Sequence, residues 1–94
     1  MDLKSFIRDV PDYPSAGILF RDLTPVMANP QAMRHVTETL CVHLSEKGIQ
    51  VIAAIDARGF IFGAPVAAEL GVPFVPLRKS GKLPPPVVGV DYAL

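Results

Sequence analysis

The strongest constraint on the fold is a run of apolar residues over 49–55 that a polar turn follows at once. The run reads IQVIAAI, which is β-branched, too short for a typical helix and apolar almost throughout. Such a run favours a strand buried on both faces of a parallel sheet. After the turn over 56–59, residues 60–70 predict a helix closed by Gly71, and residues 72–77 predict another strand. Strand, helix and strand in this order indicate a βαβ unit and an α/β fold.

Two segments before this unit have helical periodicity. Residues 3–10 place apolar side chains at helical spacing and predict a short helix that Pro11 ends. Residues 15–22 predict a turn and then a short apolar run. Asn29 and Pro30 predict the N-cap and first residue of a longer helix, and Gly48 is expected to stop it.

Prolines set further limits on the predicted βαβ unit. Pro65 must lie in or near the first turn of the helix over 60–70, or kink that helix. Pro73 and Pro76 lack the N–H that a sheet ladder needs, which favours an edge or irregular strand over 72–77. Open α/β sheets usually have about five or more strands, so two or three would leave a face or edge uncovered. We therefore expect one domain over residues 1–94 with an unfinished sheet.

Composition limits the classes of partner. Half of the residues are hydrophobic, and nine Lys and Arg balance nine Asp and Glu. A globular chain with zero net charge has no general electrostatic reason to bind nucleic acid or an anionic membrane. The apolar stretches are far shorter than the ~20 residues that span a bilayer, and the N-terminus does not resemble a signal peptide. A soluble, cytoplasmic protein is expected, with the single cysteine, Cys41, as a small buried residue.

Two segments are candidates for binding an anion. The turn over 56–59 follows a strand and opens a helix, where open α/β folds bind ligands. Helix amides and Arg58 would hold a phosphate there, and the alternative is an ordinary turn with a solvated arginine. The second segment carries Arg78, Lys79 and Lys82 within five residues directly after a strand. Its pattern is not a Walker A motif, and it fits either a phosphate loop or a solvated basic loop.

Other candidates are weaker. Phe20 lies beside turn backbone and would stack on a planar ring, although an aromatic side chain in the core is the more common role. His35 and His43 are eight residues apart and lack the spacing of a metal pair on a helix, so we expect both to be ordinary helix histidines. No Ser-His-Asp or CxxC arrangement is present, and we predict no metal site formed by the chain itself.

Four motifs taken together are far more specific than any one of them. They are PDYP at 11–14, GILFRDLTP at 17–25, DARGFIFG at 56–63 and GVPFVPLRKSGKLP at 71–84. In order and spacing they resemble adenine phosphoribosyltransferases, and the match covers nearly the whole chain. Other type I phosphoribosyltransferases, which act on hypoxanthine, orotate or uracil, share the fold but not the wording GILFRD or ARGFIFG. The resemblance implies a partial type I phosphoribosyltransferase fold, an open and mainly parallel sheet with flanking helices, incomplete at the C-terminus.

The resemblance also implies an activity in purine salvage. Adenine phosphoribosyltransferases transfer ribose 5-phosphate from phosphoribosyl pyrophosphate (PRPP) to adenine, which gives AMP and pyrophosphate. They use Mg²⁺ with PRPP, form homodimers and pass through an oxocarbenium-like transition state at the ribose C1. Carried over to this chain, Leu19 and Arg21 would contact adenine through backbone groups, and Phe20 would stack on the ring.

The pyrophosphate would be bound by cations of the two later segments. The resemblance implies that Arg58, Lys79 and Lys82 contact this group, with Arg78 a weaker candidate that acts across a dimer interface. It also implies a non-proline cis peptide bond near Asp56-Ala57.

Two parts of the family pattern are missing from these 94 residues. One is a Glu-Tyr-Gly segment on a flexible lid, whose Glu is the proposed proton-transfer partner of the base. The other is an Asp-Asp and Thr-Gly-Gly-Thr loop that holds the ribose and its 5-phosphate. No catalytic residue is therefore expected within the chain. Three interpretations stay open: a piece of an active transferase, a truncated inactive relative that binds purine or dimerises, and a gene-model error.

Overall fold

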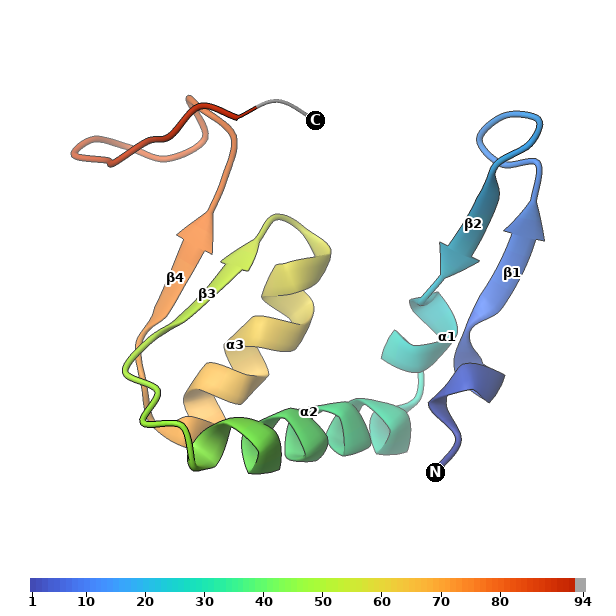
Figure 1. Ribbon diagram of the computed structural model, residues 1–94, viewed down its shortest axis with the longest axis horizontal. Coiled ribbons are helices and arrows are strands. Elements are labelled where there is room, and N and C mark those ends of the chain that lie inside the picture. Colours follow the sequence, from blue (N-terminus) through green and yellow to red (C-terminus); the bar gives the residue numbers. More distant parts are fainter. Residues whose placement is uncertain (93–94) are drawn as a thin grey trace. The chain divides into compact units, whose positions relative to one another are not determined.

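The chain forms two compact units, Met1–Leu44 and Ser45–Leu94, in a computed structural model that describes residues 1–92 (Figure 1). The first unit contains a β-hairpin and two helices. The second contains two strands joined by a helix and ends in an irregular segment that includes the basic loop.

The hairpin of the first unit is formed by β1 (Arg8–Pro11) and β2 (Leu19–Asp22), which pair antiparallel. The loop between them is ordered by the Asp12 carboxylate, whose Oδ1 accepts a hydrogen bond from the Gly17 amide at 2.9 Å. Asp12 itself has a φ of 56°, a conformation that Asp adopts more readily than most residues.

This hairpin corrects the helix predicted over residues 3–10. Only Leu3–Phe6 are helical, as a single 3-10 turn capped by the Asp2 side chain, and the chain then extends into β1. A helix of about eight residues has few hydrogen bonds to offset its nucleation cost, whereas β1 gains a ladder with β2. The helical spacing of the apolar residues was therefore outweighed by a strand partner further along the chain.

The helical part of the first unit follows the hairpin as α1 (Thr24–Met27) and α2 (Pro30–Ser45). Asn29 caps α2 as predicted, because its Oδ1 accepts a hydrogen bond from the Ala32 amide at 2.9 Å. Gly48 has the left-handed φ of 64° expected near a helix end, but α2 stops earlier and residues 46–48 form a turn. Cys41 is buried on α2, as the sequence predicts.

Asp22 ends β2 as a buried carboxylate with partners on both sides. Its Oδ1 accepts hydrogen bonds from the backbone amide and the hydroxyl of Thr24, at 2.9 and 2.8 Å. Its Oδ2 lies 3.0 Å from Nη2 of Arg8. The Thr24 hydrogen bonds, with a smaller contribution from Arg8, hold the pKa of Asp22 below its ordinary value despite burial. This network joins β2 to both β1 and the start of α1.

The lowered pKa of Asp22 predicts acid sensitivity of the first unit. A carboxyl with a depressed folded-state pKa stabilises the fold above its unfolded-state pKa, and that stability is lost as the pH falls through the folded-state value. Urea unfolding between about pH 6 and about pH 3 should show this loss, and Asp22→Asn should reduce it. Asp9→Asn is the matched control, since the Asp9 side chain is 56% exposed. An equal pH response in the wild type and Asp22→Asn would refute the prediction.

The second unit is a βαβ unit, as predicted. It consists of β3 (Ile52–Ile55), α3 (Arg58–Leu70) and β4 (Phe74–Leu77), and the two strands pair parallel with Ile55 opposite Leu77. Gly71 closes α3 with a φ of 71°, which confirms its predicted role. Pro65 lies inside α3, well beyond its first turn.

The expectation that β3 is buried on both faces is wrong within the described residues. Exposure alternates along both strands, and the outward residues Ile55 and Leu77 are 66% and 46% exposed. A parallel sheet becomes buried on both faces only when crossover helices cover both of them. In this unit α3 packs on one face.

Two glycines allow α3 to lie directly on β3. A Cβ added at Gly63 would come within 2.9 Å of the Ala54 Cβ and 3.0 Å of the Phe74 ring, which is closer than carbon atoms pack. A Cβ at Gly59, one turn earlier, would meet the Ala54 Cβ at 3.2 Å. The small residues at these positions therefore allow the close approach of helix and sheet.

We predict that Gly63→Ala destabilises the second unit by about 1–2 kcal/mol, because overpacking outweighs the gain in helix propensity. The free energy of unfolding measured in urea tests this. Gly59→Ala is the graded control, with a smaller effect because its contact is less close. A stability gain at Gly63 would show that the helix moves away without cost.

Candidate functional site

The segment predicted to bind adenine lies on β2. Leu19 and Arg21 are exposed, Phe20 between them is half-buried, and the strand pairs with β1 on one side. The Phe20 ring packs against Tyr13 with ring centres 5.2 Å apart and planes at 77°, an edge-to-face geometry that restricts its orientation. The Arg21 side chain is 66% exposed and lies 3.4 Å from Asp9. The three predicted residues are thus consecutive on one strand, with a fixed aromatic ring at the centre.

The turn predicted to bind pyrophosphate lies between β3 and α3. The amide of Asp56 still donates to the Leu77 carbonyl at 3.1 Å, so the turn begins where the ladder ends. The Asp56–Ala57 peptide bond is cis, as the family resemblance implied. Ala57 is the N-cap of α3 and provides no side-chain acceptor for the helix amides, and Arg58 is the first residue of the helix.

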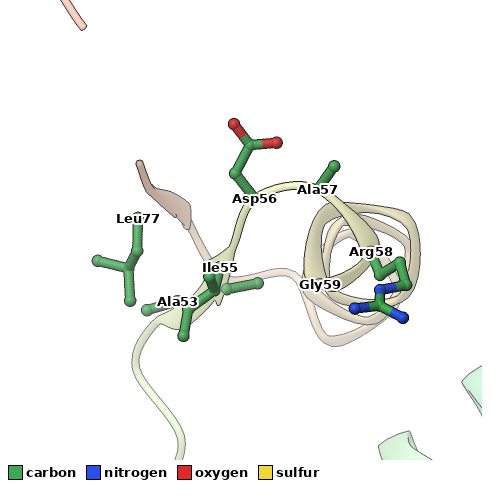
Figure 2. A pocket seen from close by; sticks show the side chains of 8 residues that line it. Ala53, Ile55, Asp56, Ala57, Arg58, Gly59 and Leu77 are labelled. Atoms are coloured by element: carbon green, nitrogen blue, oxygen red, sulfur yellow. The ribbon is translucent and has the colours of Figure 1, made fainter. Parts of the chain in front are cut away.

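An open depression of about 540 Å³ lies at this turn (Figure 2). It is lined by the end of β3, the turn itself and one residue of β4, namely Ala53, Ala54, Ile55, Asp56, Ala57, Arg58, Gly59 and Leu77. The Asp56 carboxylate and the Arg58 guanidinium extend in different directions from the turn. Helix amides without a side-chain cap beside an exposed arginine suit a bound anion.

The basic segment follows β4 and is ordered by hydrogen bonds rather than merely solvated. The Arg78 Nε donates to Oδ2 of Asp56 at 2.9 Å, and its Nη1 donates to the Lys82 carbonyl at 3.1 Å. The Lys82 amide donates to the Lys79 carbonyl at 3.2 Å, which closes a turn in which Gly81 has a φ of 84°. Lys79 and Lys82 are exposed, so their ammonium groups face solvent or a ligand.

The structure therefore brings the basic segment to the Asp56 turn, which sequence reasoning did not state. Asp56 was not predicted as a site residue. The signal was present in the sequence, because residues that follow two parallel neighbouring strands lie at the same edge of the sheet. Asp56 and Arg78 each come directly after paired strand ends, Ile55 and Leu77.

The described residues do not fit a protein-held Mg²⁺ site. No cluster of three His, Cys, Asp or Glu side chains occurs among residues 1–92, and Asp56, the acidic residue of the turn, is paired with Arg78. Mg²⁺ commonly binds through phosphate oxygens of a substrate and retains several waters. Among the described helices, none has the length and apolar character to cross a membrane.

Comparisons with known proteins show what the chain is similar to. A scan against protein-family models found no match. The chain is 55% identical over all 94 residues to an adenine phosphoribosyltransferase of Thermosynechococcus vestitus and covers 55% of that protein. The crystal structure of the Thermoanaerobacter pseudethanolicus enzyme matches 97% of the chain, and the chain covers 54% of it, with a TM-score of 0.91 and 46% identity. The Saccharomyces cerevisiae enzyme, complexed with an imino-altritol bisphosphate and adenine, matches 89%, and the chain covers 52% of it, with a TM-score of 0.85 and 41% identity.

The fold is thus part of the type I phosphoribosyltransferase fold, as the sequence predicts. Hundreds of curated sequences match, and those most similar to this chain carry one name. Over its whole length the chain is similar to adenine phosphoribosyltransferases. It spans about half the length of the curated relatives it matches.

Proposed function

We propose that this chain provides the adenine-binding and pyrophosphate-binding segments of an enzyme of purine salvage. The enzyme transfers ribose 5-phosphate from PRPP to adenine and releases AMP and pyrophosphate. The observation that supports the proposal best is the parallel register of β3 and β4, which brings the Asp56 turn and the basic segment to one edge of the sheet. A chain that carries both an anion-binding edge and a base-binding strand suits a reaction with an anionic leaving group.

In the proposed reaction the N9 atom of adenine forms a bond to the ribose C1 while the bond from C1 to the pyrophosphate oxygen breaks. The electron pair of that bond leaves with pyrophosphate, and N9 loses its proton to a group outside these 94 residues. Arg58, Lys79 and Lys82 stabilise the negative charge that develops on pyrophosphate. Mg²⁺ bound to PRPP oxygens would neutralise further charge on the same group. Phe20 stacks on adenine and holds its plane, and backbone groups of Leu19 and Arg21 contact the edge of the ring.

The substrates, the assembly and the compartment in this proposal are those that the family resemblance implies. The substrates are adenine and PRPP rather than a nucleic acid or a membrane, the assembly is a homodimer and the compartment is the cytoplasm.

The stacking role of Phe20 is tested in a completed chain, in which residues 1–94 are joined to the part of the Thermosynechococcus vestitus relative that the alignment leaves uncovered. We predict that Phe20→Ala weakens adenine binding about tenfold, since base–aromatic stacking contributes about 1–3 kcal/mol. Phe20→Tyr keeps a ring and should bind normally. Calorimetry with adenine measures the loss, and PRPP affinity serves as the internal control. Equal affinities for Phe20→Ala and the wild type would exclude stacking on this ring.

A further inference from the structure

The register of the hairpin decides which backbone groups β2 presents to a ligand. The Ile18 carbonyl, just before β2, accepts a hydrogen bond from the Tyr13 amide at 3.1 Å, on the side of the strand that faces β1. Backbone groups alternate in direction along a strand, so those of Leu19 and Arg21 point away from β1. Pro11, which lies opposite Leu19, fits this arrangement because it has no N–H to donate. The two residues proposed to contact the edge of adenine direct their backbone groups to this side only while the register holds.

Asp22, the last residue of β2, fixes the end of the strand to two other segments. Across the hairpin, its Oδ2 accepts a hydrogen bond from Nε of Arg8 at 3.1 Å, and Nη2 of the same arginine lies 3.0 Å away. Beyond the strand, its Oδ1 accepts from the amide and the hydroxyl of Thr24, where α1 begins. Helix α1 in turn contacts the 3-10 turn that precedes β1. Because Asp22 is only 8% exposed, these contacts hold the backbone directly after Arg21 in one place.

The charges of the hairpin oppose the neighbouring registers. Arg8 lies opposite Asp22 and Asp9 lies opposite Arg21, so each strand carries one residue of either sign. A shift by one residue would place Arg8 opposite Arg21 in one direction, or Asp9 opposite Asp22 in the other, and like charges directly opposite each other destabilise a strand pair. The Asp9 and Arg21 side chains are 56% and 66% exposed and 3.4 Å apart, so their pair contributes little. The buried Asp22 is therefore the stronger determinant of the register.

We propose that Asp22 is a positioning residue for base recognition, which keeps β2 in the register that presents the backbone groups of Leu19 and Arg21 to adenine. The inference rests on the proposed function, since it concerns the same base-binding strand. It gives Asp22 no contact with either substrate. Loss of the carboxylate charge should therefore weaken the recognition of adenine and leave the use of PRPP unchanged.

The test is steady-state kinetics of AMP formation by the completed chain, with adenine and PRPP varied in turn. Asp22→Asn, which keeps the size of the side chain and removes its charge, should raise the KM for adenine about tenfold, because a displaced strand orients the base poorly. The KM for PRPP, and kcat at saturating adenine, should stay within about twofold. The matched control is Asp9→Asn, which removes the exposed acid at the adjacent register position and should leave all three constants within about twofold.

Thr24 provides a second and milder test. Thr24→Val removes the hydroxyl that donates to Oδ1 of Asp22 and should raise the KM for adenine about threefold. Thr24→Ser keeps the hydroxyl and should retain the wild-type value. Circular dichroism checks that each variant is folded, and if Asp22→Asn does not fold, the comparison of Thr24→Val with Thr24→Ser decides the inference.

The outcomes separate the inference from the proposed function. A KM for adenine that neither Asp22→Asn nor Thr24→Val changes would overturn the inference. Equal rises in the KM for adenine and for PRPP would overturn it as well, because they indicate a general loss of structure. Absence of AMP formation by the wild-type completed chain would refute the proposed function, and the inference with it.

Discussion

The 94-residue polypeptide, incubated with adenine, PRPP and Mg²⁺, should form no AMP above the uncatalysed background, whereas the completed chain should form it readily. The reason lies in the missing groups. The family resemblance implies an acidic pair and a loop of amides that hold the ribose 5-phosphate, and a glutamate proposed to take the proton of the base. None of these motifs occurs in the 94 residues. Without them PRPP lacks its second anchor, and orientation of the reacting atoms, which contributes much of an enzymatic rate, is lost.

Chromatographic detection of AMP over many hours measures this difference. Turnover by the pure 94-residue chain would contradict the prediction and show that its own residues provide the missing functions. Adenine binding by the same polypeptide, followed through the amide signals of residues 19–21, is a separate measurement. Binding without turnover would support a purine-binding module, the alternative that the sequence left open.

Arg58→Ala in the completed chain should weaken pyrophosphate binding about 100-fold and leave adenine binding within about twofold, since a charge-assisted arginine–phosphate contact is among the stronger polar interactions. Arg58 is exposed in the first turn of α3, so its removal leaves no buried partner unpaired and should not unfold the unit. Calorimetry with magnesium pyrophosphate and with adenine compares the two affinities.

The matched control for Arg58 is Arg34→Ala, which removes an exposed arginine from α2 in the first unit. It should change neither affinity. If Arg58→Ala weakened adenine and pyrophosphate binding equally, the residue would act on the fold or on both ligands, and its assignment to pyrophosphate would be wrong.

Local patterns predicted the fold best where the partners of a segment are near it in sequence. The βαβ unit has both strands and its helix within residues 52–77, and its apolar runs, its closing glycine and its polar turn indicated each element. The N-cap at Asn29 was likewise a local signal, and its hydrogen bond to the Ala32 amide confirms it.

The predictions that were wrong or missed have a common physical cause. In each case the structure of a segment depends on another segment that is distant in the sequence. Residues 3–10 have helical spacing, but residues 8–11 form a strand because they pair with β2, eight or more residues further on. Burial of β3 on both faces was inferred from its apolar residues alone, although burial depends on how many layers cover the sheet. The ion pair of Asp56 and Arg78 depends on the register of two strands, which no single-segment pattern contains.

The site residues also fall into those that sequence motifs indicated and those whose contacts depend on distant parts of the chain. The family motifs indicated which segments carry chemistry, and the cis bond after Asp56 confirms one detail of that resemblance. The roles of Leu19, Phe20 and Arg21 toward adenine, and of Arg58, Lys79 and Lys82 toward pyrophosphate, stay predictions for the experiments above. Arg78 donates hydrogen bonds to the Asp56 carboxylate and the Lys82 carbonyl, contacts that the motif alone did not indicate.

The boundary near Leu44 has a consequence for how specificity can change during evolution. On the proposed function, the choice of nucleobase is encoded before this boundary and the handling of the leaving group after it. Substitutions that change base preference and substitutions that change anion binding would therefore fall in different segments of the chain. A library that randomises residues 12–21 alone would vary the proposed base-binding strand and leave every residue of the anion-binding edge unchanged.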